Sequence, residues 1–180
     1  MSRSYTTQGI ILKRINYGEY DRIVTVLTRE RGKHACIAKG ARKLTSSKRA
    51  MLEPGNYVRV FCVETKSMPI LTQAVLLENT AAMTHSLTAY RNVSQLLEIL
   101  EKLFVEEAID EELFEQVLGL RSAVLQQQGG PGVVRQQLGA LIAALGFQHP
   151  DESDHATVSE YLEALLAQPL RSFEFLRVGA

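Results

Sequence analysis

Apolar and polar positions alternate along five short segments of the first eighty residues. Val, Ile, Thr and aromatic side chains dominate these segments, and glycines or prolines separate them, which is typical of β-strands joined by tight turns. Within 57–63, Val58, Val60 and Cys62 share one face, and Arg59 and Phe61 share the other. The pattern predicts strands at 7–15, 21–29, 33–39, 56–65 and 69–78.

Five strands within eighty residues favour a small closed β-barrel. An OB-type barrel, whose open face and loops often bind single-stranded nucleic acids, fits the pattern. An SH3-like barrel fits almost as well, so the strand pattern alone leaves both open.

After Glu78 the apolar residues follow the three- and four-residue spacing of helices. The first helix has a stripe of apolar residues at Tyr90, Val93, Leu96, Leu97, Leu100, Leu103 and Phe104. A second helix begins after Asp110, which is a plausible N-cap. It buries Leu113, Val117, Leu120 and Val124.

Two further helices complete this half. The third begins at Pro131 and ends at Gly146. The fourth begins with a capping box of Thr157 and Glu160 and ends before Pro169. The sequence therefore predicts an α+β protein of two domains, with a five-stranded barrel at 1–80 and a helical bundle at 81–180.

The overall charge of zero conceals a strong asymmetry between the two halves. Residues 1–78 hold fourteen Lys and Arg against six Asp and Glu, a net charge of +8, and the rest nets −8. Such an asymmetry indicates a half that binds a polyanion beside a half with a different task. No apolar run resembles a membrane span or a secretory signal. Cys36 and Cys62 are expected as buried, reduced thiols of a cytoplasmic, nucleoid-associated protein.

The cations concentrate in one loop between the third and fourth strands. The segment from Arg31 to Leu52 contains no Asp or Glu. Its loop carries Lys39, Arg42, Lys43, Lys48 and Arg49. Backbone phosphates are the natural counter-charge, because each neutralised phosphate releases condensed counterions. Small residues such as Gly40 predict a flexible loop, suited to contacting a nucleic-acid backbone.

Two tyrosines flank the preceding turn, in the segment INYGEYDR at 15–22. Tyr17 or Tyr20 could stack on bases, close to Lys13, Arg14 and Arg22. The alternative is a structural role, in which one ring covers the barrel end and Arg22 pairs with an acidic neighbour.

No motif of catalysis is present. The sequence lacks a nucleophile elbow, a phosphate loop and a zinc-protease motif. The cluster HPDESDH at 149–155 lacks cysteine and a helical pair of histidines, so it is a poor metal site. We therefore expect no enzymatic activity, no catalytic residue, no bound metal and no cofactor. A metal-dependent hydrolase or nuclease using this cluster is the rival hypothesis.

The N-terminal half contains the segments YGEYDRIVTVLT, RGK, AKGARK and LEP, in that order. With these segments at matching spacing, it resembles the RecO family of bacterial recombination mediators. The helical half matches more loosely, through DEELFEQVL, VRQQLGALIAALGFQHPD and the terminal LRSFEFLR. Many members carry a zinc-binding insertion with C-x-x-C pairs after the helix ending in LGF. Here HPDESDHAT leads almost directly into the last helix, and no cysteine follows Cys62, which indicates a short member without zinc there.

The resemblance implies an OB barrel followed by a helical domain, and a function without catalysis. Such a protein binds single- and double-stranded DNA, anneals complementary strands, and works with RecR to load RecA onto strands coated by single-strand binding protein. The implied DNA-binding residues are Lys13, Arg14, Tyr17, Arg22, Arg31, Lys33, Lys39, Arg42, Lys43, Lys48, Arg49 and Arg59. The implied site for the acidic, apolar-tipped tail of the single-strand binding protein comprises Arg135, Val134, Leu138 and, more weakly, Arg121. The remaining rival is a barrel adaptor that binds RNA or an acidic protein.

Overall fold

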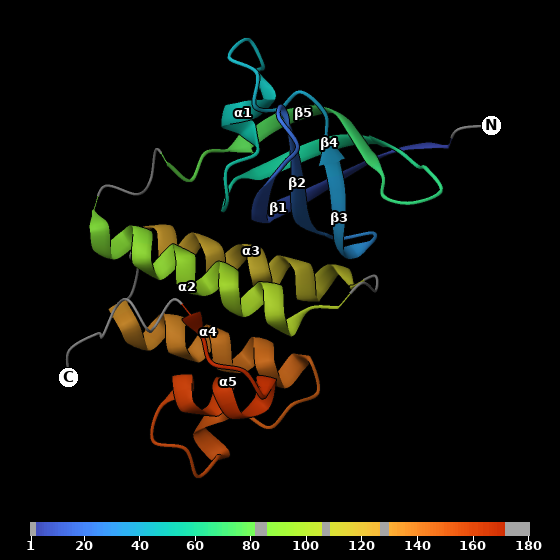
Figure 1. Ribbon diagram of the computed structural model, residues 1–180. Helices are drawn as coiled ribbons and strands as arrows, with labels where there is room; N and C mark the ends of the chain where they lie inside the picture. Colours follow the sequence, from blue (N-terminus) through green and yellow to red (C-terminus); the bar gives the residue numbers. More distant parts are fainter. Residues whose placement is uncertain (1–2, 82–85, 106–108, 127–129, 172–180) are drawn as a thin grey trace. The chain divides into compact units, whose positions relative to one another are not determined.

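The computed structural model describes residues 3–81, 86–105, 109–126 and 130–171 (Figure 1). The chain forms two compact units. The first comprises Met1–Ala82 with Phe104–Asp110, and the second comprises Met83–Leu103 with Glu111–Ala180. Most of the terminal segment LRSFEFLR lies outside the described residues.

Five strands form the first unit, and they confirm the predicted order of strands followed by helices. The strands are β1 (Ser4–Tyr17), β2 (Asp21–Thr28), β3 (Gly32–Ala38), β4 (Tyr57–Val63) and β5 (Ile70–Glu78). They pair in the order β1-β2-β3-β5-β4 and close as a barrel. All pairings are antiparallel except that of β3 with β5.

Closure of the barrel depends on β1, which pairs with two different strands. Residues 4–10 pair with β4, and residues from Gly9 to Tyr17 pair with β2. Gly9 lies where the two pairings overlap, opposite both Thr28 and Val58. A Cβ atom at Gly9 would overlap the Leu27 carbonyl oxygen and lie 2.7 Å from Thr28 Cγ2. Only glycine therefore lets the strands approach closely enough at this bend.

The barrel interior consists of the alternating residues that the strand pattern predicts. Its buried core is formed by Ile11, Val24, Val26, Cys36, Ala38, Ala41, Leu52, Val58, Val60, Cys62 and Leu71. The two thiols are free and buried, as predicted, with their sulfur atoms 3.8 Å apart. A hydrogen bond with Cys62, together with burial, raises the pKa of Cys36, so this thiol stays protonated.

The second unit is helical, and its elements confirm the predicted helices closely. They are α2 (Leu87–Leu103), α3 (Glu111–Gln126), α4 (Gly130–Ala144), a 3-10 turn η1 (Pro150–Glu152) and α5 (Val158–Leu166). The predicted capping box of Thr157 and Glu160 opens α5. No helix among the described residues is long and apolar enough to cross a membrane.

One predicted position on α2 is wrong. Tyr90 was expected in the buried stripe, but 65% of its surface is exposed. Ala89, one helical turn before Val93, occupies the buried position instead and is fully covered. The small side chain allows close packing there, so the aromatic neighbour faces solvent.

We predict that Gly9→Ala destabilises the barrel by about 3 kcal/mol, because the new methyl group overlaps backbone at the bend of β1. Gly18→Ala is the matched control. Gly18 has a positive φ of 57° but no atom within 4 Å of an added Cβ, so it should cost only about 1 kcal/mol. Urea unfolding measures both, and equal costs would exclude the steric explanation.

Candidate nucleic-acid interface

The cationic loop between β3 and β4 is fixed to the turn between β1 and β2. The Gly40 amide donates to Asp21 Oδ1 at 2.7 Å, and the Arg42 amide donates to the Tyr20 carbonyl at 2.9 Å. The Arg42 guanidinium also donates to the Gly18 carbonyl at 3.0 Å. These bonds correct the expectation of a flexible loop, because its first residues are anchored to a neighbouring turn.

The second half of the loop is a single helical turn that the sequence pattern did not predict, α1 (Lys48–Met51). The Lys48 ammonium donates to the Lys39 carbonyl at 2.8 Å and so bridges the two ends of the loop. Asn56, which is buried, donates from Nδ2 to the carbonyls of Ala50 and Met51. The same side chain accepts the Thr80 amide through Oδ1, so Asn56 joins α1 to the end of β5.

The buried side chain of Arg22 supports the loop through a hydrogen bond to its backbone. The Arg22 guanidinium donates to the Arg49 carbonyl at 3.3 Å, while Glu53 lies 3.4 Å from the same Nη1. Glu53 also forms an ion pair with Arg14 at 2.7 Å. Burial is the main cause that lowers the pKa of Arg22. The predicted DNA contact at Arg22 is therefore corrected: the buried side chain positions the loop.

The five loop cations form no close ion pair with an acidic side chain of the described residues. Lys39, Lys43 and Arg49 are exposed, and Arg42 and Lys48 are half-buried. Within the part of the chain that the structure describes, none of them forms an ion pair with a carboxylate. Their positive charge is thus available to an anionic ligand.

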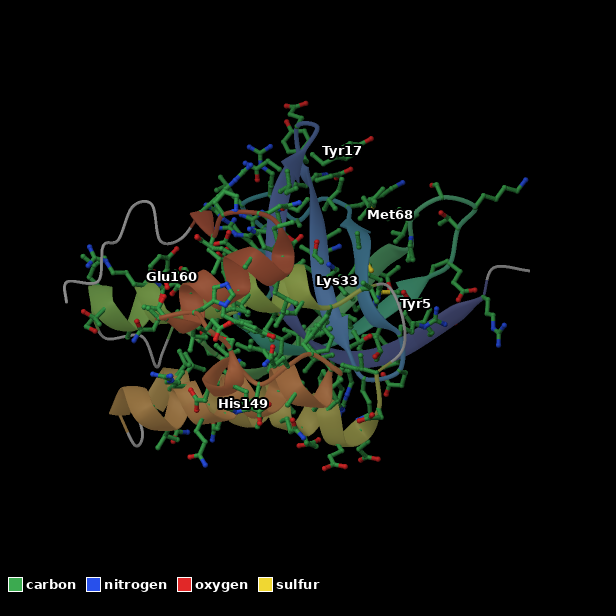
Figure 2. All side chains as sticks on the ribbon, turned by 90° about the horizontal axis from the view of Figure 1, so that it is seen from below. Tyr5, Tyr17, Lys33, Met68, His149 and Glu160 are labelled. Carbon is green, nitrogen blue, oxygen red and sulfur yellow. The ribbon has the colours of Figure 1, made fainter. Side chains whose placement is uncertain are left out.

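Aromatic side chains lie on the same side of the barrel as the loop. Tyr17 and Tyr20 are about half exposed, at 53% and 47%. The Lys43 ammonium lies 5.6 Å from the centroid of the Tyr20 ring, within the range of a cation–π contact. A hydrogen bond with Glu19 raises the pKa of Tyr20. Figure 2 shows Tyr17 near one end of β1 and Tyr5 near the other.

The structure places Arg31 and Lys33 away from this loop. Arg31 lies in the turn between β2 and β3, and Lys33 lies at the start of β3. The strand β2 separates that turn from the one at Gly18 by about 25 Å of extended chain. Arg31 contacts the ring of Tyr5 at 3.6 Å and pairs with Glu64 at 3.0 Å. The predicted DNA-binding residues therefore form two groups at opposite ends of β2. Lys13 and Arg59 are exposed on β1 and β4.

The helical unit contains a cavity of about 700 Å³ between α2, α3, α4 and α5. Val134, Arg135 and Leu138 on α4, which the sequence singled out together, all line it. Arg121 does not belong to this lining, and its side chain is buried in α3. The cavity is mainly apolar, with amide groups from Asn92 and Gln95 along α2.

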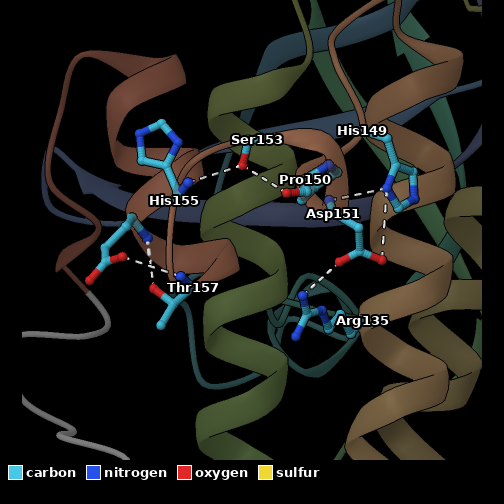
Figure 3. Close-up of polar contacts among 8 residues, drawn as sticks. Arg135, His149, Pro150, Asp151, Ser153, His155 and Thr157 are labelled. Carbon is cyan, nitrogen blue, oxygen red and sulfur yellow. Dashed lines mark hydrogen bonds and ion pairs between the residues drawn. The ribbon is translucent and has the colours of Figure 1, made fainter.

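Arg135 is the cation at this cavity, and it already has an acidic partner. Its guanidinium donates to Asp151 Oδ1 at 2.6 Å, with both side chains more than half exposed (Figure 3). His149 Nδ1 accepts the Asp151 amide at 3.2 Å. Among the described residues there is no cluster of three or more side chains that could hold a metal ion.

The fold and these sites define an α+β protein in which a closed barrel carries a cationic loop and a helical unit carries a mainly apolar cavity. Residues 1–80 match the family described as Recombination protein O N terminal. This N-terminal part of the chain therefore belongs to the RecO family.

Curated relatives extend the match beyond the barrel. DNA repair protein RecO of Heliobacterium modesticaldum is 39% identical over 101 residues, which cover 56% of this chain and 37% of that protein. The Nocardioides protein of the same name is 32% identical over 148 residues, 79% of this chain and 60% of that protein. The Bifidobacterium longum protein is 31% identical over 134 residues, 72% and 55%. The chain spans about half the length of the curated relatives it matches.

We predict that Asp21→Ala loosens the loop, because the Gly40 amide loses its side-chain acceptor. Exchange of the Gly40 amide with deuterated water should become roughly fivefold faster, since one hydrogen bond contributes about 1 kcal/mol. Glu19→Ala removes the same charge from the same turn and should leave this amide unchanged. Equal exchange in both variants, followed by NMR, would exclude Asp21 as the anchor.

Proposed function

We propose that this chain is a DNA repair protein that binds single- and double-stranded DNA with the loop at Lys39–Arg49. The observation that carries the proposal is the set of five cations on an anchored loop that form no close ion pair with a carboxylate of the described residues. Phosphates supply the missing counter-charge at the regular spacing of a nucleic-acid backbone. The relatives, which are named DNA repair protein RecO, support DNA as the polyanion.

We further propose that the barrel is of OB type and that the helical unit is a bundle, with a domain boundary near residue 80. The five-stranded closed order supports the first assignment. Barrels of this type often present strands and loops to single-stranded nucleic acids, which agrees with the cationic loop and exposed tyrosines at one end.

Contacts to phosphates suit strand annealing. Phosphate contacts fix a strand in position but do not read its sequence. A strand held by Lys39, Lys43 and Arg49 keeps its Watson–Crick edges free for a complementary strand. Tyr17 or Tyr20 adds a stacking platform that tolerates any base. In this account Arg22 positions the loop, while Arg31, Lys33, Arg59 and Lys13 extend the basic surface around the barrel.

The helical cavity is our proposed site for the acidic, apolar-tipped tail of the single-strand binding protein. Val134 and Leu138 would contact the apolar tip, and Arg135 would pair with a carboxylate of the tail. Arg121 is left out of this site because its side chain is buried. Such a contact, together with RecR, would bring the protein to coated strands, where RecA is loaded. The function requires no catalysis, metal or cofactor.

We expect binding of a labelled single strand to weaken steeply with salt. If about five phosphates are neutralised, the log–log slope should be about −3 to −4. The double variant Lys43→Ala with Arg49→Ala should reduce the magnitude of this slope by about 1.4, because two contacts are lost. The matched control removes two exposed cations elsewhere in the unit, Arg3 and Lys66.

A slope near zero for the unmodified chain would contradict electrostatic binding of DNA. Equal slopes for the two double variants would exclude the loop as its location. Preference for structured RNA over single-stranded DNA in the same titration would favour the adaptor hypothesis. Cleavage of the labelled strand in the presence of Mg²⁺ or Mn²⁺ would favour the nuclease hypothesis.

If the tail binds in this cavity, substitutions at the two partners of the ion pair should have opposite effects on its affinity. Arg135→Ala should weaken binding of an acidic peptide with an apolar C-terminus by roughly tenfold, the loss of one charge-assisted hydrogen bond. Asp151→Asn should strengthen it, because the peptide no longer competes with the Asp151 carboxylate. Arg171→Ala, which removes an exposed cation outside the cavity lining, is the control. Fluorescence anisotropy measures all three, and weaker binding by Asp151→Asn would contradict the site.

A further inference from the structure

The tip of the cationic loop carries an exposed apolar side chain that does not belong to the barrel core. Leu44 is 90% exposed, the highest value among the large apolar residues that are exposed in the described structure. It lies between Lys43 and Ser46, where the Ser46 amide donates to the Lys43 carbonyl at 3.0 Å. The preceding turn is closed in the same way, from the Lys43 amide to the Gly40 carbonyl at 3.1 Å.

These hydrogen bonds hold Leu44 outward. The Lys48 ammonium closes the base of the loop on the Lys39 carbonyl, and the Gly40 and Arg42 amides are tied to the adjacent turn. Leu44 therefore occupies the tip of a loop whose ends are fixed. The Leu44 side chain is not part of the barrel core. The loop contributes Ala41 and Leu52 to that core instead.

Single exposed apolar residues are common on protein surfaces, so exposure alone carries no inference. The surroundings of Leu44 distinguish it from such residues. The five cations flanking it form no close ion pair with a carboxylate of the described residues, and the exposed Tyr17 and Tyr20 belong to the turn to which the loop is tied. The ligand of this tip must therefore combine regularly spaced negative charges with flat apolar faces, and a nucleic acid has both.

We propose that Leu44 is a wedge that inserts between neighbouring bases of the strand whose phosphates the loop cations hold. This inference rests on the proposed function. Apolar side chains that enter a base step unstack it and bend the strand. Unstacked bases held by their phosphates present their pairing edges outward. Leu44 thus acts on the bases, and the lysines and arginines act on the backbone.

A lipid surface is the other ligand that combines anionic charge with apolar contact. Peripheral membrane segments insert a broad apolar face, whereas this loop presents one leucine. The tyrosine rings beside the loop suit base stacking. Nucleobases are therefore the occupant that the geometry favours.

The test uses the full chain and a single strand containing 2-aminopurine, whose fluorescence rises when neighbouring bases unstack. The unmodified chain should raise the fluorescence on binding, and Leu44→Ala should abolish the rise and weaken binding by about three- to tenfold. The salt slope should stay unchanged, because no charge is removed. Leu44→Met should retain the rise, since it keeps a long apolar side chain. Val75→Ala, an exposed apolar residue on β5, is the control.

The outcomes separate the wedge from the function on which it rests. If the unmodified chain binds DNA with the expected salt slope but Leu44→Ala gives the same affinity and fluorescence, the wedge is refuted and the DNA-binding loop stands. If the unmodified chain shows no salt slope, the DNA-binding function itself is refuted. If Leu44→Ala leaves DNA binding intact but prevents binding to vesicles containing phosphatidylserine, the tip is a lipid contact and the wedge is also refuted.

Discussion

The N-terminal unit depends on the pairing of β1 with two strands at once. The strand changes partner around Gly9 and Ile10, which pair with both β4 and β2, while earlier residues pair with β4 and later ones with β2. Closure then fixes every other register, including the pairing of Arg22 with Ala38 between β2 and β3. Because these strands are antiparallel, the turn before Arg22 lies beside the loop after Ala38. The anchoring bonds from Gly40 and Arg42 to that turn follow from this register.

The placement of the acidic residues explains how a loop of five cations stays folded without losing its charge. Like charges in one loop repel one another, and an exposed salt bridge contributes little to stability. The acidic groups of this region act at the base of the loop: Asp21 accepts a backbone amide, and Glu53 neutralises Arg14 and the buried Arg22. The loop is therefore held by hydrogen bonds to backbone and by one buried cation with its partner. The exposed cations keep their charge for a ligand.

Local sequence patterns predicted most of the helices and strands. They predicted fewer of the side-chain contacts at the two sites. Alternation along the strands identified the barrel interior, and the capping box at Thr157 identified the start of α5, because both depend on neighbours within a few residues. Helical spacing brought Val134 and Leu138 together on one cavity. The burial of Arg22, the separation of Arg31 from the loop and the pairing of Arg135 with Asp151 depend on strand register and tertiary packing. The order of the cations along the sequence contains no information on strand register or packing. It therefore could not show that the Arg121 side chain is buried.

The two sites differ in how their cations are satisfied, and this difference bears on reversibility. The loop cations form no ion pair with a carboxylate of the described residues, so in the proposed function a bound strand displaces none and gains from counterion release. Arg135 has Asp151 as an internal competitor, so an acidic peptide must replace an existing ion pair to bind. The peptide then gains mainly from its apolar contacts in the cavity, and the net electrostatic gain is small. In the proposed function, this combination would give strong, salt-dependent binding to the DNA strand and easily reversed binding to the protein that covers it.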